Sequence, residues 1–233
     1  RTDHNVNTTI RMKAIDYCLE MAEEFGVGIV GVSNSSHPGA MASFALKAAR
    51  LGYIAFAFTH ADPLTLSHDG KRPYFGTNPV CVAVPREEEE PYCLDMATSM
   101  ISWNKLLLHK SNNKPLNEAL AADKDGQPTK DPQEAVSLLP AGAYKGYGLA
   151  SMVEILCSVF TGMAFGRDIP PMYKAPMDKP RHLGQFYMVM RSDGCIEKSE
   201  FSNMMQQMTD EVRLEPAQDN QKVMLAGDPQ KYE

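Results

Sequence analysis

Features that would place this chain in a membrane or on a nucleic acid are missing from its sequence. The longest apolar stretch, Leu149 to Phe160, is shorter than the ~20 residues needed to span a bilayer and contains Glu154. The N-terminus shows no basic-then-apolar pattern of the kind that directs export. The net charge is -6, with no stripe of lysine and arginine, so we expect neither a membrane nor a nucleic acid as a partner.

Cysteine is scarce, and its pattern indicates neither disulfides nor a metal. The five cysteines are odd in number and scattered, without the paired spacing of zinc fingers, so a reduced, cytoplasmic compartment fits best. With 43% hydrophobic and 22% charged residues, the 233-residue chain is expected to be globular, as one large domain or two small ones. The chain starts at Arg1 without methionine, so we expect an N-terminal portion of the natural protein to precede it.

Three common signatures are also absent. No GxGxxG follows the first predicted strand, and neither GxxxxGK[ST] nor GxSxG occurs anywhere in the chain. A Rossmann dinucleotide site, a P-loop and an α/β-hydrolase elbow are therefore excluded in their usual forms.

The hydrophobic periodicity that is present predicts a mixed α/β fold with one sheet covered by helices. Strands at 27–32 and 54–59, separated by a helix at 40–51, predict a parallel pair with a right-handed crossover. Strands at 80–84 and 92–96 predict a hairpin.

Other elements follow from composition and period. The run from Arg86 to Glu90 is expected to be the solvated tip of the hairpin, and 111–132 a polar excursion over the surface. Further helices are expected at 8–25, 103–110, 146–162 and 199–213, and another strand at 185–190.

His37 is the first candidate for chemistry. It lies between the end of a predicted strand and the start of a helix, and open α/β sheets bind ligands at the carboxyl ends of their strands. The positive end of that helix disfavours an imidazolium, so a neutral ring would be ready to accept a proton from a hydroxyl group. The alternative is a loop histidine that only caps the helix.

Asp62 follows the second predicted strand and is expected beside His37, where it could orient the imidazole or bind substrate. An aspartate before proline is more commonly a helix cap or an Asx-turn. His37, His60 and Asp62 together would instead suggest a metal site, and with it a metal-dependent hydrolase or lyase.

Cations and small residues indicate where an anion would bind. Lys145 and Gly146 open the long apolar helix, where a lysine is electrostatically poor unless exposed N–H groups and its charge bind an anion. Asp95-Met96-Ala97 closes a strand before two hydroxyl residues, which suits phosphate or ribose contacts, although a plain helix cap is equally available. Arg181 has a guanidinium able to grip a carboxylate, with an exposed surface arginine as the alternative.

Seven segments, in this order, resemble the malate/L-lactate dehydrogenase family: VGIVGVSNSSHPG, FTHADP, FGTNPV, LDMATS, LLPAGAYKGYG, FGRDIP and RHLGQ. The DMAT, KGYG and FGR elements are most similar to its ureidoglycolate dehydrogenase branch. The resemblance implies a non-Rossmann α/β fold, a homodimer, and NAD or NADP as cofactor. It implies that residues 1–233 form one cofactor-binding and catalytic core. It also implies hydride transfer to or from a small 2-hydroxy acid such as ureidoglycolate, malate or lactate.

The resemblance further implies roles for single residues. His37 would be the acid/base, with Asp62 and Arg181 near the substrate. The family also has an N-terminal helical segment with a Ser-His-Gly element that this sequence lacks, so an inactive assembly fragment is a further alternative. Relatives often have serine where Ala61 stands. The implied cofactor contacts are Ala61, Asp95, Met96, Ala97, Lys145, Gly146 and, in a later loop, Gly227, Asp228 and Pro229.

Overall fold

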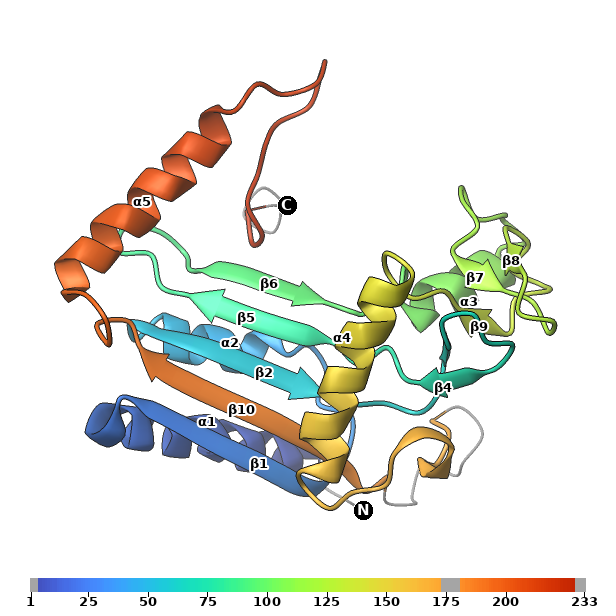
Figure 1. The fold of residues 1–233 in the computed structure, drawn as a ribbon, viewed down its shortest axis with the longest axis horizontal. Coiled ribbons are helices and arrows are strands. Elements are labelled where there is room, and N and C mark those ends of the chain that lie inside the picture. Colours follow the sequence, from blue (N-terminus) through green and yellow to red (C-terminus); the bar gives the residue numbers. More distant parts are fainter. Residues whose placement is uncertain (1–3, 173–180, 229–233) are drawn as a thin grey trace.

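A computed structural model describes residues 4–172 and 181–228 and contains two sheets (Figure 1). In the main sheet every neighbouring pair is antiparallel. Its strands, in spatial order, are β1 (Val27–Ser35), β10 (Leu183–Arg191), β2 (Tyr53–Thr59), β5 (Val80–Val84) and β6 (Tyr92–Met96).

The expected parallel pair of β1 and β2 was wrong. The two strands run in the same direction, but β10 lies between them and pairs antiparallel with both. Local periodicity predicts that a strand exists and which face it buries, but a strand from the far end of the chain competes equally for the same edge. The predicted hairpin of β5 and β6 is confirmed.

Helices α1 (His4–Phe25) and α2 (Ala42–Ala49) cover one face of the main sheet (Figure 1). Small residues on this face allow the helices to approach closely. At Gly28 a Cβ would stand 2.1 Å from the carbonyl oxygen of Cys18, so no larger residue fits between β1 and α1.

The opposite face is only partly covered. Helix α4 (Tyr144–Glu154), which continues into a π-helical turn at Ile155–Val159, crosses one end of it (Figure 1). There Val153 and Cys157 pack on Phe58 and Phe186. The predicted helix at 146–162 is thus confirmed in place, although its last turns are π-helical. Phe56 and Met188 also pack against the cluster around Val153. Beyond it lies the open sheet face, formed by residues of alternating register: Val27, Ile29, Met190, Ile54, Val82, Val84, Tyr92 and Leu94.

A second, smaller sheet lies beyond the end of the main sheet (Figure 1). With α3 (Trp103–Ser111) it encloses a core of its own. The predicted excursion at 111–132 supplies two of its strands, a sheet that the prediction missed because two-residue strands carry no period. The strands are β4 (Pro73–Phe75), β3 (Thr65–Leu66), β9 (Ser137–Leu138), β7 (Ala121–Ala122) and β8 (Pro128–Thr129).

The chain then passes through β10 into α5 (Lys198–Leu214) and returns along β6, where Cys93 N–H donates to the carbonyl of Ala226. Arg86, expected at a solvated tip, is instead fully buried and lies 3.1 Å from Asp228. The prediction failed because Asp228, far along the chain, supplies the charge that permits burial. No helix within the described ranges is long and apolar enough to cross a membrane.

Candidate active site

Most of the predicted site residues lie where the strands of the main sheet start or stop, at one end of the sheet, which we call the site edge. Here β1, β2 and β6 end while β5 and β10 begin, as their paired registers show. The site edge is on the right in Figure 1, beside α4. The loops that meet there are 36–39, 60–63, 76–79, 97–99 and 181–182.

His37 is exposed in the loop between β1 and α2. Its Nδ1 accepts the N–H of Gly39 at 3.1 Å, so the neutral ring in this arrangement carries its proton on Nε2. That contact agrees with the loop-capping alternative. A base that acts through Nε2 needs the other tautomer, and the catalytic role of His37 stays a prediction.

Asp95 binds the start of α2, the helix that follows the His37 loop. Its Oδ2 accepts the N–H of Ala42 at 2.8 Å, in the first turn of α2. Burial raises the pKa of this carboxyl, and hydrogen bonds from the helix backbone oppose that rise. Asp95 therefore caps the helix that follows His37, a contact between distant segments that the sequence pattern does not contain.

The contacts recorded for Asp62 go to residues other than His37. Its Oδ1 is 2.6 Å from Nη2 of Arg181, and its Oδ2 accepts the N–H of Met172 at 3.0 Å. Among the described residues Asp62 thus binds Arg181 and Met172 rather than His37, because β10 separates the strands that carry Asp62 and His37.

Arg181 is the partner that fixes Asp62, and it is not the exposed surface arginine of the alternative interpretation. Its side chain is 14% exposed, and Nη2 also donates to the carbonyl of Pro170 at 3.1 Å. Its Nε and Nη1 are buried and have no hydrogen-bond partner among the described residues. These two nitrogens of the guanidinium therefore still have N–H groups that can donate to a ligand at the site.

The start of α4 differs from the expectation of exposed N–H groups. The N–H of Gly146 donates to the carbonyl of Ala141 at 2.7 Å, and that of Lys145 to Gly142 at 3.2 Å. The preceding tight turn has taken these donors, so the exposed Lys145 side chain is what remains for an anion. His37 and Lys145 lie at the site edge, but α2 and α4 cover opposite faces of the sheet (Figure 1).

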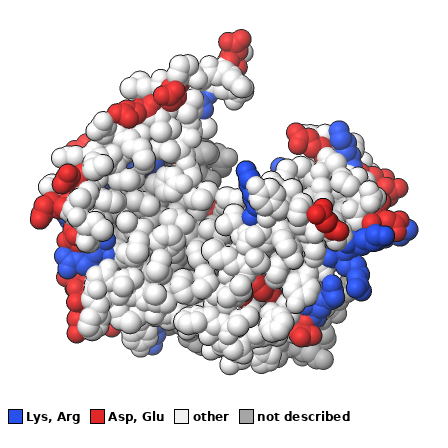
Figure 2. Space-filling model, in the orientation of Figure 1, with Lys and Arg blue, Asp and Glu red and all other residues white. Residues whose placement is uncertain are grey.

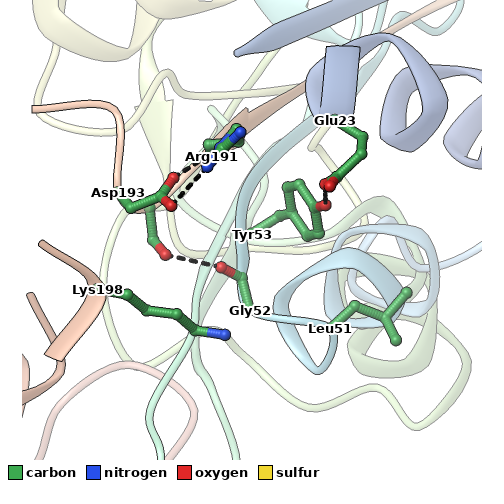
Figure 3. A pocket seen from close by; sticks show the side chains of 8 residues that line it. Glu23, Leu51, Gly52, Tyr53, Arg191, Asp193 and Lys198 are labelled. Atoms are coloured by element: carbon green, nitrogen blue, oxygen red, sulfur yellow. Dashed lines mark hydrogen bonds and ion pairs between the residues drawn. The ribbon is translucent and has the colours of Figure 1, made fainter.

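A hollow of about 410 Å³ lies beside this helix start. Two of the residues predicted to contact a cofactor, Met96 and Ala97, line it together with Ser99, Ser102 and Ala141. A second hollow, of about 210 Å³, lies at the other end of the sheet (Figure 3). There Arg191 and Asp193 pair at 2.7 Å, and none of the predicted site residues is part of it.

The remaining predicted cofactor residues divide between two places. Ala61 is buried, and its N–H donates to Oδ1 of Asn78 at 3.1 Å. Gly227 has φ +92° against β6, where a Cβ would stand 3.0 Å from the nitrogen of Cys93. The carboxylate of Asp228 is bound by two arginines. Pro229 lies outside the described residues.

The metal alternative finds no site. His60 is fully buried, and its Nε2 accepts the N–H of Gly184 at 2.8 Å, so this nitrogen is already used. Within residues 4–172 and 181–228 no group of three histidine, cysteine or acidic side chains is placed to hold a metal ion. The constellation needed by a metal-dependent hydrolase or lyase is thus not assembled there.

Sequence reasoning missed Glu154 and Asn78, which are both buried at the centre of the site edge. Their side chains bond to each other at 2.7 Å. The signal that could have found Glu154 was its position as the one charged residue inside the apolar stretch of the long helix.

Comparison with known proteins agrees with this architecture. The profile of the family described as malate/L-lactate dehydrogenase matches residues 3–233. The chain belongs to the malate/L-lactate dehydrogenase family. The predicted resemblance and the mixed α/β fold class are both confirmed.

Individual relatives extend this finding. The chain is 35% identical over 217 residues to ureidoglycolate dehydrogenase (NAD(+)) of Escherichia coli (strain K12), covering 93% of this chain and 62% of that protein. It is 33% identical to (2R)-3-sulfolactate dehydrogenase (NADP(+)) of Chromohalobacter salexigens, covering 84% and 61%. The structure of sulfolactate dehydrogenase from Methanocaldococcus jannaschii superposes with a TM-score of 0.89 at 27% identity, covering 97% of this chain and 65% of that one. The chain thus spans less than two thirds of these relatives.

Proposed function

We propose that this chain forms the core of an NAD(P)-dependent dehydrogenase that moves a hydride between a nicotinamide and a small 2-hydroxy acid. Membership of the family supports the reaction class. The names of two relatives include ureidoglycolate with NAD(+) and sulfolactate with NADP(+), so both cofactors belong in the test.

At the level of residues, the proposal rests on the buried N–H donors of Arg181. Its Nε and Nη1 are buried without a partner among the described residues, while Asp62 anchors Nη2. Buried donors are normally satisfied, and the N–H groups of Nε and Nη1 can each donate a charge-assisted hydrogen bond to a carboxylate oxygen. A 2-hydroxy acid supplies that carboxylate, and its α-hydroxyl would then lie a fixed distance from the guanidinium.

The proton is assigned to His37. In the oxidation of the alcohol, the imidazole would take the hydroxyl proton, and the substrate would lose a hydride to become a 2-keto acid. A nicotinamide, when bound, would accept that hydride. A positioned acid/base of this kind contributes about 10²–10⁴ in rate. To act through Nε2, the ring must release the Gly39 N–H from Nδ1, a local change in an exposed loop.

The hollow beside α4 has chemistry that fits a cofactor. Its volume of about 410 Å³ falls inside the ~300–1,000 Å³ typical of ligand pockets. Met96 supplies apolar contact area and Ser99 a hydroxyl, while the exposed ammonium of Lys145 at the adjacent helix start would pair with phosphate. Buried Gly146 lets the helix approach the strand end, since a Cβ there would meet the carbonyl oxygen of Thr98 at 2.5 Å.

The test is the absorbance of reduced nicotinamide over a panel of 2-hydroxy acids, with NAD and with NADP. Arg181→Lys keeps the charge but loses the Nε and Nη1 donors, and we expect it to raise the substrate KM about tenfold with little change in cofactor affinity. Arg191→Lys, in a partly exposed ion pair at the other end of the sheet, is the control. An unchanged KM in Arg181→Lys refutes the substrate role, and no signal with any acid refutes the reaction.

We further infer that the protein is a homodimer, joined through the open sheet face and the π-helical turn that follows α4. Ile155, Val159 and Phe160 are 55–62% exposed, and Val27 and Ile29 are 42% and 47% exposed. Figure 2 shows few charged side chains over the middle of this face, while acidic and basic groups gather toward its rims. Apolar patches of this kind mark interfaces, and a standard interface needs about 800 Å² from each partner.

A cytoplasmic location is part of the same proposal. All five cysteines are free thiols, and Cys18, Cys81 and Cys157 are buried in the core. Thiols used as small apolar residues suit a reducing compartment. Fractionation of the native host, with the protein recovered among cytoplasmic markers, is the measurement.

A further inference from the structure

A buried carboxylate lies at the point where three loops of the candidate site come together. The side chain of Glu154, near the end of α4, is 4% exposed. Its Oε1 accepts the N–H of Gly166 at 2.7 Å, and its Oε2 accepts Nδ2 of Asn78 at 2.7 Å. Both oxygens are thus acceptors for donors from separate segments of the chain.

The bond to Asn78 leads to the loop of Asp62. Asn78 is fully buried, and its Oδ1 accepts the N–H of Ala61 at 3.1 Å, one residue before Asp62. Its Nδ2 donates to the carbonyl of Ala150 as well as to Glu154. The orientation of the amide is therefore set on both sides, with oxygen toward the Asp62 loop and nitrogen toward α4.

The bond to Gly166 leads to the second loop. Gly166 has φ +55°, and a Cβ there would lie 2.7 Å from the ring of Tyr74, so the position requires glycine. It opens a short 3₁₀ turn, Gly166–Asp168. That turn runs into Pro170, whose carbonyl accepts from Arg181.

The third loop is the one that carries Arg181. It is linked to Glu154 by way of His60, which is fully buried. Its Nε2 accepts the N–H of Gly184, three residues after Arg181, so the proton of the neutral ring is on Nδ1. Nδ1 lies 3.9 Å from Oε2 of Glu154, beyond hydrogen-bond distance but close enough for the charge to favour this tautomer.

We propose that Glu154 is a positioning residue for the Asp62–Arg181 pair. It accepts hydrogen bonds from Gly166 and from Asn78, which binds the Asp62 loop, and its charge lies 3.9 Å from His60, which binds Gly184. A carboxylate is required because donors face both oxygens, and a neutral amide would present one NH₂ group to another donor. The consequence for substrate binding rests on the proposed function. The structural coupling between the loops does not.

The variants follow from this donor pattern. Glu154→Gln keeps the shape but sets donor against donor, either at Gly166 or at Asn78. Asn78→Asp alone sets two carboxylates against each other, whereas the double variant allows the glutamine amide introduced by Glu154→Gln to donate to the new carboxylate. Glu118→Gln is the matched control, because Glu118 is exposed in the second sheet region.

The first measurement is hydrogen exchange by mass spectrometry, with urea unfolding to establish that each variant folds. We expect Glu154→Gln to speed exchange about tenfold in the segments 60–62, 166–172 and 181–184, with the centre of β10 unchanged. The double variant should exchange more slowly in these segments than Asn78→Asp alone, and Glu118→Gln should behave as the original chain. Exchange unchanged at 60–62 and 181–184, or raised throughout the sheet, overturns the proposal.

The second measurement separates this inference from the proposed function. If the original protein oxidises a 2-hydroxy acid, Glu154→Gln should raise the substrate KM about tenfold while cofactor affinity changes less than about twofold, since it displaces Arg181 and not the hollow beside α4. Activity in the original with an unchanged KM in the variant overturns the positioning role alone. An inactive original overturns the proposed function, and the exchange data still decide the coupling.

Discussion

Replacing Asp228 with asparagine tests whether a buried charge cluster holds the C-terminal segment to the main sheet. The carboxylate is 1% exposed and is 3.1 Å from Nη1 of Arg86 and 2.7 Å from Nη2 of Arg213. Its Oδ2 accepts Nε of Arg213 and the N–H of Leu225, both at 3.0 Å. The cluster joins α5, the β5–β6 turn and the loop of Gly227.

The expected loss in the free energy of unfolding follows from the number of N–H donors that face the Asp228 carboxylate. In Asp228→Asn an NH₂ group replaces one oxygen and faces N–H donors, and buried Arg86 loses its contact at 3.1 Å and keeps the longer one, 3.5 Å, to Glu89. Removing one partner of a buried ion pair costs about 3–5 kcal/mol. Arg213 keeps Glu89 at 3.0 and 2.9 Å, which places the expected loss at the lower end, about 3 kcal/mol.

The same residue sets a pH dependence. The hydrogen bond from Arg213, assisted by Leu225 N–H and Arg86, holds the pKa of Asp228 well below its ordinary 3.8, although burial opposes the shift. A folded-state pKa below the unfolded one stabilises the protein above the unfolded value. The contribution is complete above about pH 5 and is lost as pH falls through 3.8 toward the lower folded value, because the proton then binds the unfolded chain first.

The assay is urea unfolding at pH 7 and at stepwise lower pH, with Asp125→Asn as control. Asp125 pairs with Lys124 at 2.6 Å, but both side chains are exposed, at 65% and 81%, so solvent screens the pair and the control should lose little stability. The gap between the original and Asp228→Asn should narrow below pH 4. Equal losses in Asp228→Asn and Asp125→Asn at pH 7, or a gap independent of pH, would refute the reasoning.

Three shorter predictions concern the site and the assembly. His37→Ala in the active protein should lower kcat by about 10²–10⁴ with cofactor affinity retained, measured by turnover and by nicotinamide fluorescence titration; equal loss of both would give His37 a structural role. Gly146→Ala should destabilise by about 1–3 kcal/mol, because its Cβ would meet Ala141 and Thr98 oxygens at 2.4 and 2.5 Å, whereas Gly148→Ala, with nothing within 4 Å, should not destabilise; thermal unfolding compares the two. Phe160→Glu, at a side chain 62% exposed, should convert a dimer to monomers in light scattering, and an unchanged mass would move the interface elsewhere.

Local elements were predictable because their signal is local. The apolar period located α1, α2 and α5, and the alternation before and after the charged run located β5 and β6. The ordered motifs were sufficient to predict family membership, which the comparison confirmed. Main-sheet order was not predictable, since the insertion of β10 between β1 and β2 leaves no trace in the period of any strand.

Partners of buried charges were equally hidden. In the sequence, Asp62, Arg181, Arg86 and Asp228 have no visible partner. Each was therefore interpreted from its neighbours along the chain, Arg86 as part of a solvated turn and the other three as site residues. In the fold Asp62 binds Arg181, and Arg86 binds Asp228. A buried charge needs a partner within a few ångströms, and that partner is chosen by which distant segments the packing brings together.

The pattern of residues along the chain was enough to predict the long helices, all five main-sheet strands, the family, and the candidates for chemistry at the strand ends. Folding alone established that Asp95 caps α2, that the turn before α4 takes its first N–H groups, and that Glu154 accepts hydrogen bonds from both Asn78 and Gly166. The period of apolar residues that predicts a helix or strand lies within a short stretch of sequence. Hydrogen bonds and charge pairs, in contrast, form between atoms that become neighbours only when the chain folds.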